Sequence, residues 1–335
     1  MHSSMKLEAT MRALADQTRL RIMQLLGTME LAVGELAQVL GQSQPRVSRH
    51  IAILCDAGVA ERRREGSWVF LRARLNDAEA GALGQAVAHL LKISEDDDAE
   101  FAQLCEQDRS RLAAIRQARE AGAADWFAAH AADWDDLRRL HTPDDAVEAA
   151  LAHALGADGL GTVLDIGTGT GRMAELFSDK ADRIVALDKS LEMLRVARAK
   201  LQNLPADQVE LVQGDFLNLP FADGRFDTVL LHQVLHFAQD PKRALAEAAR
   251  VAKPGARIAI VDFSAHTRED LRQRFQHERL GFTDRQIHQM LQQAGFSPSK
   301  PIALEGGELV VKVWLGSRLA PPSEIQSEPA KETAL

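Results

Sequence analysis

Hydrophobic and polar residues follow one another in the first part of the chain in a pattern that predicts short helices and then a hairpin. Apolar residues recur with helical spacing over 20–26, 33–40 and 47–54. Pro45 suits the first turn of the third helix. Over 59–72 the pattern alternates about a glycine-containing turn, which predicts two short strands.

The pattern then changes twice. Residues 94–145 are charged and rich in Ala, Gln and Arg, which predicts a helical linker and cap. Within 146–318, short β-rich runs alternate with helical stretches, which predicts βαβ units and a parallel, Rossmann-like sheet. Residues 319–335 are polar with three prolines and are expected to be disordered. The fold class expected is therefore α/β, preceded by an α+β head over 1–93.

Composition narrows the setting in which the protein works. No run of about 18 apolar residues is present to span a membrane, and the N-terminus lacks the basic-then-apolar pattern of a signal segment. Cys55 and Cys105 are the two cysteines, too few for a disulfide framework. We expect a cytoplasmic protein with no membrane partner.

Charge is distributed unevenly along the chain. Residues 1–75 contain eleven Lys and Arg against seven Asp and Glu, a balance of +4, which leaves −12 for the remainder of a chain whose net charge is −8. A basic head on an acidic body is consistent with one end that faces nucleic acid.

Hydrogen-bond donors gather on the expected third helix and on the hairpin. On the helix they are Gln44, Arg46, Ser48, Arg49 and His50, and on the hairpin Arg62, Arg63, Arg64 and Ser67. Such donors can read base edges from a recognition helix and follow the phosphate backbone from a wing, so the pattern predicts a winged helix-turn-helix on double-stranded DNA. A solvated cationic helix would carry the same residues, and composition alone leaves both interpretations open.

Three segments of the head resemble the ArsR/SmtB family of regulators: ALADQTRLRIMQLL, ELAVGELAQVLGQSQPRVSRHIAILCDAGV and ERRREGSWVFLRAR. The resemblance covers roughly the first 90 residues. It implies a homodimer whose interface is formed by the first helix and by a helix at about 77–91. Two such heads would read a pseudo-palindromic operator.

The chain lacks the cysteine pair that the metal-sensing members of that family use. Those members carry the pair where this chain has Ala32 and Gly34. Neither residue can supply the thiolate ligands that soft metal ions select. We therefore expect no metal at this position, and His89 on its own is better explained as a helix-surface residue.

The body opens with a glycine-rich turn after a β-rich run. Asp165 lies within that run, and Gly167, Gly169 and Gly171 follow it. Glycines at a strand-to-helix turn let the backbone approach a ligand closely. The spacing is GxGxG rather than the GxGxxG of dinucleotide-binding proteins.

Acidic residues are expected at the ends of the next strands. Asp188 closes the second strand, where a carboxylate can accept from both ribose hydroxyls, and Gly214, Asp215 and Phe216 are expected to close the third, where a carboxylate can accept from an adenine amino group. A Rossmann-like sheet that binds no ligand is the alternative.

These motifs, in this order over about 146–316, resemble class I S-adenosylmethionine-dependent methyltransferases. The resemblance implies that Asp165 and the three glycines hold the methionyl part and the ribose edge, that Asp188 binds the ribose, and that Asp215 and Phe216 hold the adenine. His232 is added as a cofactor-binding candidate. The resemblance also implies that the last strand, at about 308–315, is antiparallel.

The methyl acceptor is narrowed by what the chain lacks. The Asn/Asp-Pro-Pro-aromatic run of adenine-N6 methyltransferases is absent after the fourth strand, and no cysteine follows residue 120 to support arsenite methylation. A small organic molecule, or no acceptor, remains. His232, His236 and His266 are candidate general bases, with His277 also in the insert after the fifth strand. Lone histidines are more often structural.

Two hypotheses follow. In the first, the protein is a repressor whose body senses S-adenosylmethionine or its demethylated product, S-adenosylhomocysteine, with the helical stretch 94–120 coupling this small-molecule ligand to operator binding. In the second, the body methylates a small molecule and the head controls its expression.

Overall fold

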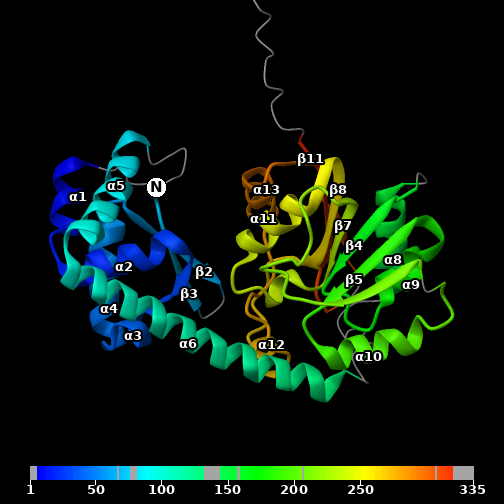
Figure 1. Ribbon diagram of the computed structural model, residues 1–335. Coiled ribbons are helices and arrows are strands. Elements are labelled where there is room, and N and C mark those ends of the chain that lie inside the picture. Colours follow the sequence, from blue (N-terminus) through cyan, green and yellow to red (C-terminus); the bar gives the residue numbers. More distant parts are fainter. Residues whose placement is uncertain are drawn as a thin grey trace, which may run out of the picture. The chain divides into compact units, whose positions relative to one another are not determined.

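The computed structural model describes residues 6–65, 68–75, 81–131, 144–156, 159–205, 207–305 and 308–319. The chain divides into two compact units. The first contains residues 1–127 together with 266–280, and the second contains residues 128–265 and 281–335. Figure 1 colours both units by position in the sequence.

The first unit is a set of helices around a small antiparallel sheet. The sheet has three strands in the order β1-β3-β2. The elements in chain order are α1 (Leu7–Leu14), α2 (Gln17–Thr28), β1 (Leu31–Ala32), α3 (Val33–Leu40), α4 (Gln44–Asp56), β2 (Ala60–Glu65), β3 (Trp68–Ala73), α5 (Gly81–Asp97) and α6 (Ala99–His130), followed by α12 (Asp270–Arg274) much later in the chain.

Local sequence signals set the bounds of the head's helices. The Asp16 side chain caps α2 by accepting from the Arg19 backbone N–H at 3.0 Å. Gly41 ends α3 in the left-handed region at φ 63°. The helix-turn-helix and the hairpin therefore form where the sequence predicted them.

The core of the head is built from the apolar faces of these helices and the inner strand of the hairpin. It includes Ile22, Leu36, Ile51, Leu54 and Leu71, all of which are buried. Burial of such faces is the main source of stability for short helices.

An ion pair attaches the long helix α6 to α2. Both guanidinium nitrogens Nε and Nη2 of Arg21 lie 2.6 Å from the Asp108 carboxylate, and Asp108 is 1% exposed. The hydrogen bond to Asp108 raises the pKa of Arg21. A two-pronged contact of this kind fixes the relative orientation of the two helices.

The second unit is built on an eight-stranded mixed sheet, in the order β10-β11-β8-β7-β4-β5-β6 with β9 paired to β11. The strands are β4 (Thr162–Ile166), β5 (Arg183–Asp188), β6 (Val209–Gln213), β7 (Phe226–His232), β8 (Ala252–Phe263), β9 (Phe296–Pro298), β10 (Ile302–Leu304) and β11 (Val311–Arg318). The helices are α8 (Asp144–Leu155), α9 (Arg172–Phe177), η1 (Ser178–Lys180), α10 (Leu191–Lys200), η2 (Leu235–Phe237), α11 (Pro241–Val251) and α13 (Asp284–Gln293).

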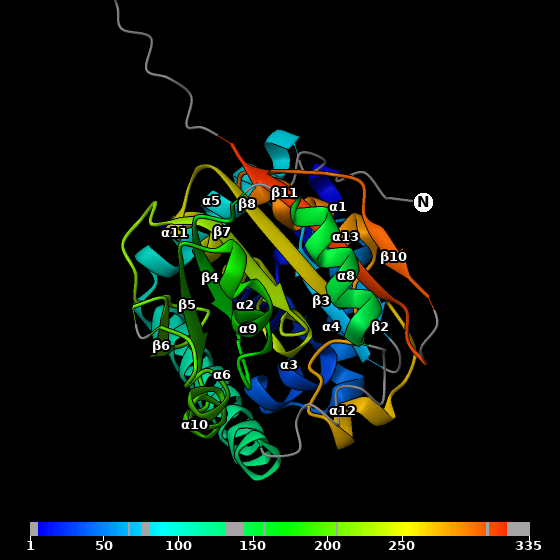
Figure 2. The ribbon, with the colours of Figure 1, turned by 90° about the vertical axis from the view of Figure 1, so that its right-hand side faces the viewer.

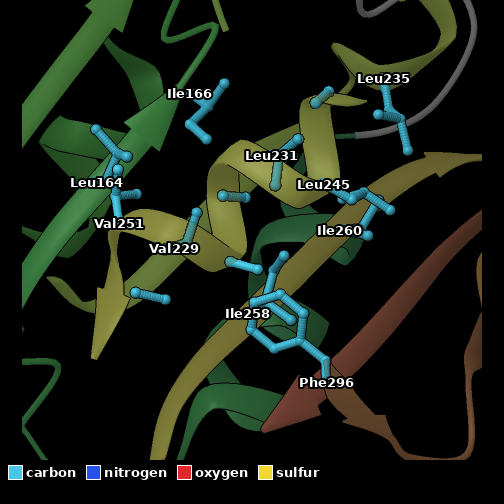
Figure 3. Packing of buried hydrophobic residues seen from close by; sticks show 14 of the residues in the cluster. Leu164, Ile166, Val229, Leu231, Leu235, Leu245, Val251, Ile258, Ile260 and Phe296 are labelled. Atoms are coloured by element: carbon cyan, nitrogen blue, oxygen red, sulfur yellow. The ribbon is translucent and has the colours of Figure 1, made fainter. Parts of the chain in front are cut away.

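Both faces of this sheet are buried. Leu164, Ile166 and Val229 point to one face and pack in a cluster that includes residues of α11 and α13 (Figure 3). Val163 and Leu230, which alternate with them and are also buried, point to the other face. Figure 2 shows α8 in front of the strands at one end of the sheet, where it contacts β8, β10 and β11. Burial on both sides explains the continuous apolar runs of the parallel strands.

The sheet confirms the expected fold class and the antiparallel last strand, since β11 pairs antiparallel with β8. The expectation that Asp215 and Phe216 close the third strand is wrong, because β6 ends at Gln213. Asp215 Oδ1 accepts from the Leu217 backbone N–H at 2.8 Å, and this local turn competes with strand pairing.

Some of the residues named in the predictions are not among those that the structure describes. Ser67 and residues 320–335 lie outside the described residues, as does the turn at Gly66. Among the helices that the structure does describe, α6 included, each is too short or too polar to cross a membrane.

Candidate functional sites

The loop after β4 is shaped by its glycines. Gly167, Gly169 and Gly171 have φ values of 69°, 55° and 84°, in the left-handed region that favours glycine. The backbone N–H groups of Gly167 and Thr168 both donate to the Leu187 carbonyl, at 2.8 and 2.9 Å. The loop is thus tied to the end of β5, and its bare backbone leaves room for a ligand to approach.

Gly167 is required for a second reason. A Cβ at this position would lie 2.3 Å from Cγ2 of Val234, in the segment that follows β7. The loops after β4 and β7 therefore touch at a point where only glycine fits. The strand order reverses between β4 and β7, and open α/β sheets bind ligands in the crevice at such a point.

Asp188, the last residue of β5, faces this loop. Its Oδ2 accepts from the Gly169 backbone N–H at 2.8 Å and its Oδ1 from the Ser190 N–H at 2.9 Å. Burial raises the pKa of the Asp188 carboxyl, and these backbone hydrogen bonds oppose the rise. The Lys189 backbone also donates to this carboxylate, whose remaining lone-pair capacity can accept from a hydroxyl.

Two buried polar side chains lie beside the loop. Asp165 is 1% exposed and Thr168 is 7% exposed. The Thr168 hydroxyl has no hydrogen-bond partner among the described residues. A buried hydroxyl in this position suits a polar ligand.

Asp215 and Phe216 lie in the turn after β6. Lys189, which follows Asp188, donates from Nζ to Asp215 Oδ2 at 3.0 Å. Phe216 is half-buried and packs against the core cluster. The acidic and aromatic residues expected to hold an adenine ring thus follow the strand that neighbours β5.

A histidine and an aspartate form a buried pair after β7. His236 Nδ1 lies 2.8 Å from Asp262 Oδ1, and the two side chains are 2% and 0% exposed. Asp262 also accepts from the backbone N–H groups of His236 and Phe263, at 3.1 and 2.7 Å. Because the carboxylate is an acceptor, Nδ1 is the donor and Nε2 is left as the basic nitrogen.

Sequence reasoning missed three contributors to this region. Gln233 adopts a positive φ of 52° directly after His232, the buried last residue of β7, and such backbone strain clusters at functional sites. Val234 and Asp262 matter through contacts with partners distant in the sequence. An acid near the end of an apolar strand was the available signal for Asp262.

The candidate histidines fall in different units. His232 and His236 belong to the second unit, with the glycine loop, whereas His266 and His277 belong to the first. Over the residues that the structure describes, no group of three or more His, Cys, Asp or Glu side chains could hold a metal ion.

The recognition helix α4 separates its two faces sharply. Val47, Ile51 and Leu54 are buried in the head's core, whereas Gln44, Arg46 and Arg49 are exposed and Ser48 and His50 are half-buried. Arg62 and Arg64 on β2 are also exposed, and Arg63 lies on the same strand.

A hollow of about 520 Å³ lies beside this helix. Gln44 and Ser48 of α4 line it together with Arg62 of the hairpin and with Ala32 and Gly34 at the start of α3. The helix and the hairpin thus border one concave surface, whose lining also includes the apolar side chains of Val33, Ile51 and Val69 and the carboxylate of Glu35.

Comparisons with known proteins match both parts of the chain. Residues 16–62 match the family model "bacterial regulatory protein, arsR family", and residues 164–260 match the model "methyltransferase domain". A demethylmenaquinone methyltransferase of Renibacterium salmoninarum is 40% identical over 105 residues, which cover 31% of this chain and 42% of the relative. A chloroplastic 2-phytyl-1,4-beta-naphthoquinone methyltransferase of Arabidopsis thaliana is 39% identical over 109 residues, 30% of this chain and 41% of the relative.

The chain spans about two fifths of the length of these relatives. Among solved structures, the YcgJ protein of Bacillus subtilis is 20% identical, with a TM-score of 0.46, over 52% of this chain and all of the other.

The chain therefore carries an ArsR-family helix-turn-helix region followed by a methyltransferase domain. S-adenosylmethionine is the cofactor of such a domain. The residues present fit it, because the glycine loop would be closed by a Cβ at Gly167 and a buried hydroxyl of Thr168 lies beside the loop. The loop residues, Asp188 and Asp215 would hold the cofactor, which supplies an activated methyl group when bound.

Proposed function

We propose that this protein is a DNA-binding transcriptional repressor whose methyltransferase domain binds S-adenosylmethionine, or S-adenosylhomocysteine as the effector, and thereby changes operator affinity. The observation that carries the proposal is the division of α4 into a buried apolar face and an exposed face of base-reading donors.

A homodimer is part of the proposal. Large apolar side chains are exposed on α1 (Leu7 and Met11) and on α5 (Leu90 and Ile93), the two helices that the family resemblance assigns to the interface. Exposed apolar residues concentrated on two helices suit a self-complementary interface between two copies. A DNA-binding head and a cofactor-binding domain occur in one chain, and for this reason we rank a regulatory role ahead of a catalytic one.

The test is fluorescence anisotropy of the purified protein on its own promoter DNA at fixed salt concentration. We expect S-adenosylmethionine and S-adenosylhomocysteine to shift the operator affinity by different factors, because only the first carries the methyl group and the sulfonium charge. Arg49→Ala should weaken specific binding roughly 5- to 150-fold, the factor expected for loss of a base contact. Arg195→Ala, an exposed arginine of α10, is the matched control and should change nothing. Tight DNA binding that neither ligand shifts would contradict the coupling.

A second candidate function is methylation of a small molecule, and the His236–Asp262 pair favours it. Asp262 holds the imidazole with Nε2 as a base, which can accept the proton of an acceptor hydroxyl or of a carbon being methylated. The relatives named above are quinone methyltransferases, so a reduced naphthoquinone lacking its ring methyl group is the acceptor to try first.

The assay is transfer of a labelled methyl group from S-adenosylmethionine to that quinol. Asp262→Asn should flip the tautomer of His236, lower turnover and shift its pH profile while cofactor binding persists. Transfer that is unaffected by Asp262→Asn and by His236→Gln would remove both residues from the mechanism. His232, in the same unit as the glycine loop, remains the other candidate base.

A further inference from the structure

Residues 266–280 have an unexpected place in the molecule. In the sequence they connect β8 to α13, yet they group with residues 1–127 in the first compact unit. The segment, which contains the short helix α12, is closed at its base by a hydrogen bond of 3.0 Å from the His266 N–H to the Leu280 carbonyl. We call residues 266–280 the strap.

Arg279 of the strap is seated on the sheet of the winged head. Its guanidinium carbon lies 4.3 Å from the ring centroid of Phe70 on β3, and its Nη1 lies 3.5 Å from Glu30 Oε2, just before β1. Arg279 and Phe70 are each 4% exposed. A buried guanidinium that stacks on a ring and faces a carboxylate is held more firmly than one on the surface, because fewer water molecules compete for it.

The rest of the strap is seated by apolar contacts. Leu271 and Leu280 are fully buried, and the Phe275 ring lies 6.1 Å from that of Trp126 on α6 in an edge-to-face arrangement. Arg272 donates to the Glu278 carbonyl within the strap. These contacts make the strap a packed element of the head rather than a loop that passes it.

The strand that receives Arg279 is the one that positions the wing. β3 is the middle strand, and Phe70 pairs with Ala32 on β1 and with Arg63 on β2. Phe70 is therefore paired directly with β2, the strand that carries the candidate DNA-contacting arginines. A contact on Phe70 can influence the position of that strand.

The other end of the connection lies next to the glycine loop, because Val234, which faces Gly167, is two residues before His236. Asp262, which holds His236, is four residues before His266, and β8 leads directly into the strap. We propose that the strap is the coupling element: Arg279 holds the wing through Phe70 and Glu30. Ligand binding at the glycine loop changes operator affinity by altering this seat through Val234, His236 and Asp262. The inference rests on the proposed function, and it adds the route by which the ligand acts.

Two variants of the full-length protein test the route. Arg279→Ala removes the stacked and paired guanidinium, and Arg279→Lys keeps the charge but loses the planar stack. Arg195→Ala, an exposed arginine of α10 outside the strap, is the control. Hydrogen exchange of the β3 amides in the free protein should be faster in Arg279→Ala than in the wild type and unchanged in Arg195→Ala. Equal exchange in all three proteins would overturn the proposal.

The second measurement is the ratio of operator affinities with and without S-adenosylhomocysteine. Wild type and Arg195→Ala should share one ratio, which should be within the 5- to 150-fold range of ordinary allosteric coupling. Arg279→Ala should bring the ratio to within about twofold of one, and Arg279→Lys should be intermediate, with cofactor affinity in the calorimeter unchanged. A wild-type ratio retained in Arg279→Ala would overturn the strap. If S-adenosylhomocysteine leaves the operator affinity of the wild type unchanged, the regulatory proposal fails. The exchange experiment still decides whether Arg279 holds the wing.

Discussion

Gly167→Ala tests whether the contact between the loops after β4 and β7 sets the shape of the glycine loop. The substitution adds one methyl group at φ 69°, at a point 2.3 Å from Val234 Cγ2. A non-glycine residue in the left-handed region costs about 1–2 kcal/mol, and forcing extra volume into packed structure costs about 1–3 kcal/mol more. The free energy of unfolding should therefore fall by about 2–5 kcal/mol.

Gly224→Ala is the matched control, because Gly224 has a similar φ of 62° but nothing within 4 Å of the added Cβ. It should lose about 1–2 kcal/mol, the conformational part alone. Urea unfolding of the three proteins measures the difference. Val234→Ala in the Gly167→Ala background should recover part of the loss, since it removes the nearest methyl group.

Binding of S-adenosylmethionine gives a second readout for the same variants. Calorimetry should show an affinity at least about tenfold weaker for Gly167→Ala, which corresponds to 1.4 kcal/mol, and no change for Gly224→Ala. Equal losses of stability in the two variants, together with unchanged cofactor affinity in both, would refute the reasoning that this loop contact shapes the site.

Three further predictions concern other parts of the chain. Asp108→Ala leaves the mostly buried Arg21 guanidinium without its two-pronged partner and should lower the free energy of unfolding by about 3–5 kcal/mol, measured by urea unfolding. A loss below about 1 kcal/mol would show that α6 is held by packing alone. Burial raises the pKa of Asp188 above 3.8, so on acidification this carboxylate is protonated at a higher pH than an ordinary aspartate. Protonation removes the ribose acceptor, and the affinity for S-adenosylmethionine should fall at that pH. Calorimetry across pH should show this step in the wild type and not in Asp188→Asn. Leu90→Glu on α5 should convert the dimer to a monomer in light scattering, whereas Leu191→Glu, a somewhat more exposed leucine of α10, should not. A monomeric wild type would contradict the dimer.

Features that depend on local interactions could be predicted from the sequence alone. The Asp16 cap, Gly41 and Pro45 mark the helices of the head, and the GxGxG run marks the strand-to-helix turn, because each acts through backbone conformation within a few residues. The order of apolar runs was enough for the fold class, since strands buried on both faces differ in pattern from amphipathic helices.

Contacts between residues distant in the sequence could be found only in the folded protein. Val234 excludes a side chain at Gly167, and Asp262 holds His236 across 26 residues of sequence. The seat of Arg279 on Phe70 joins residues far apart in the chain, and no periodicity encodes it. Such contacts are fixed by how packed elements are brought together in space, and only the three-dimensional arrangement of the elements contains that information.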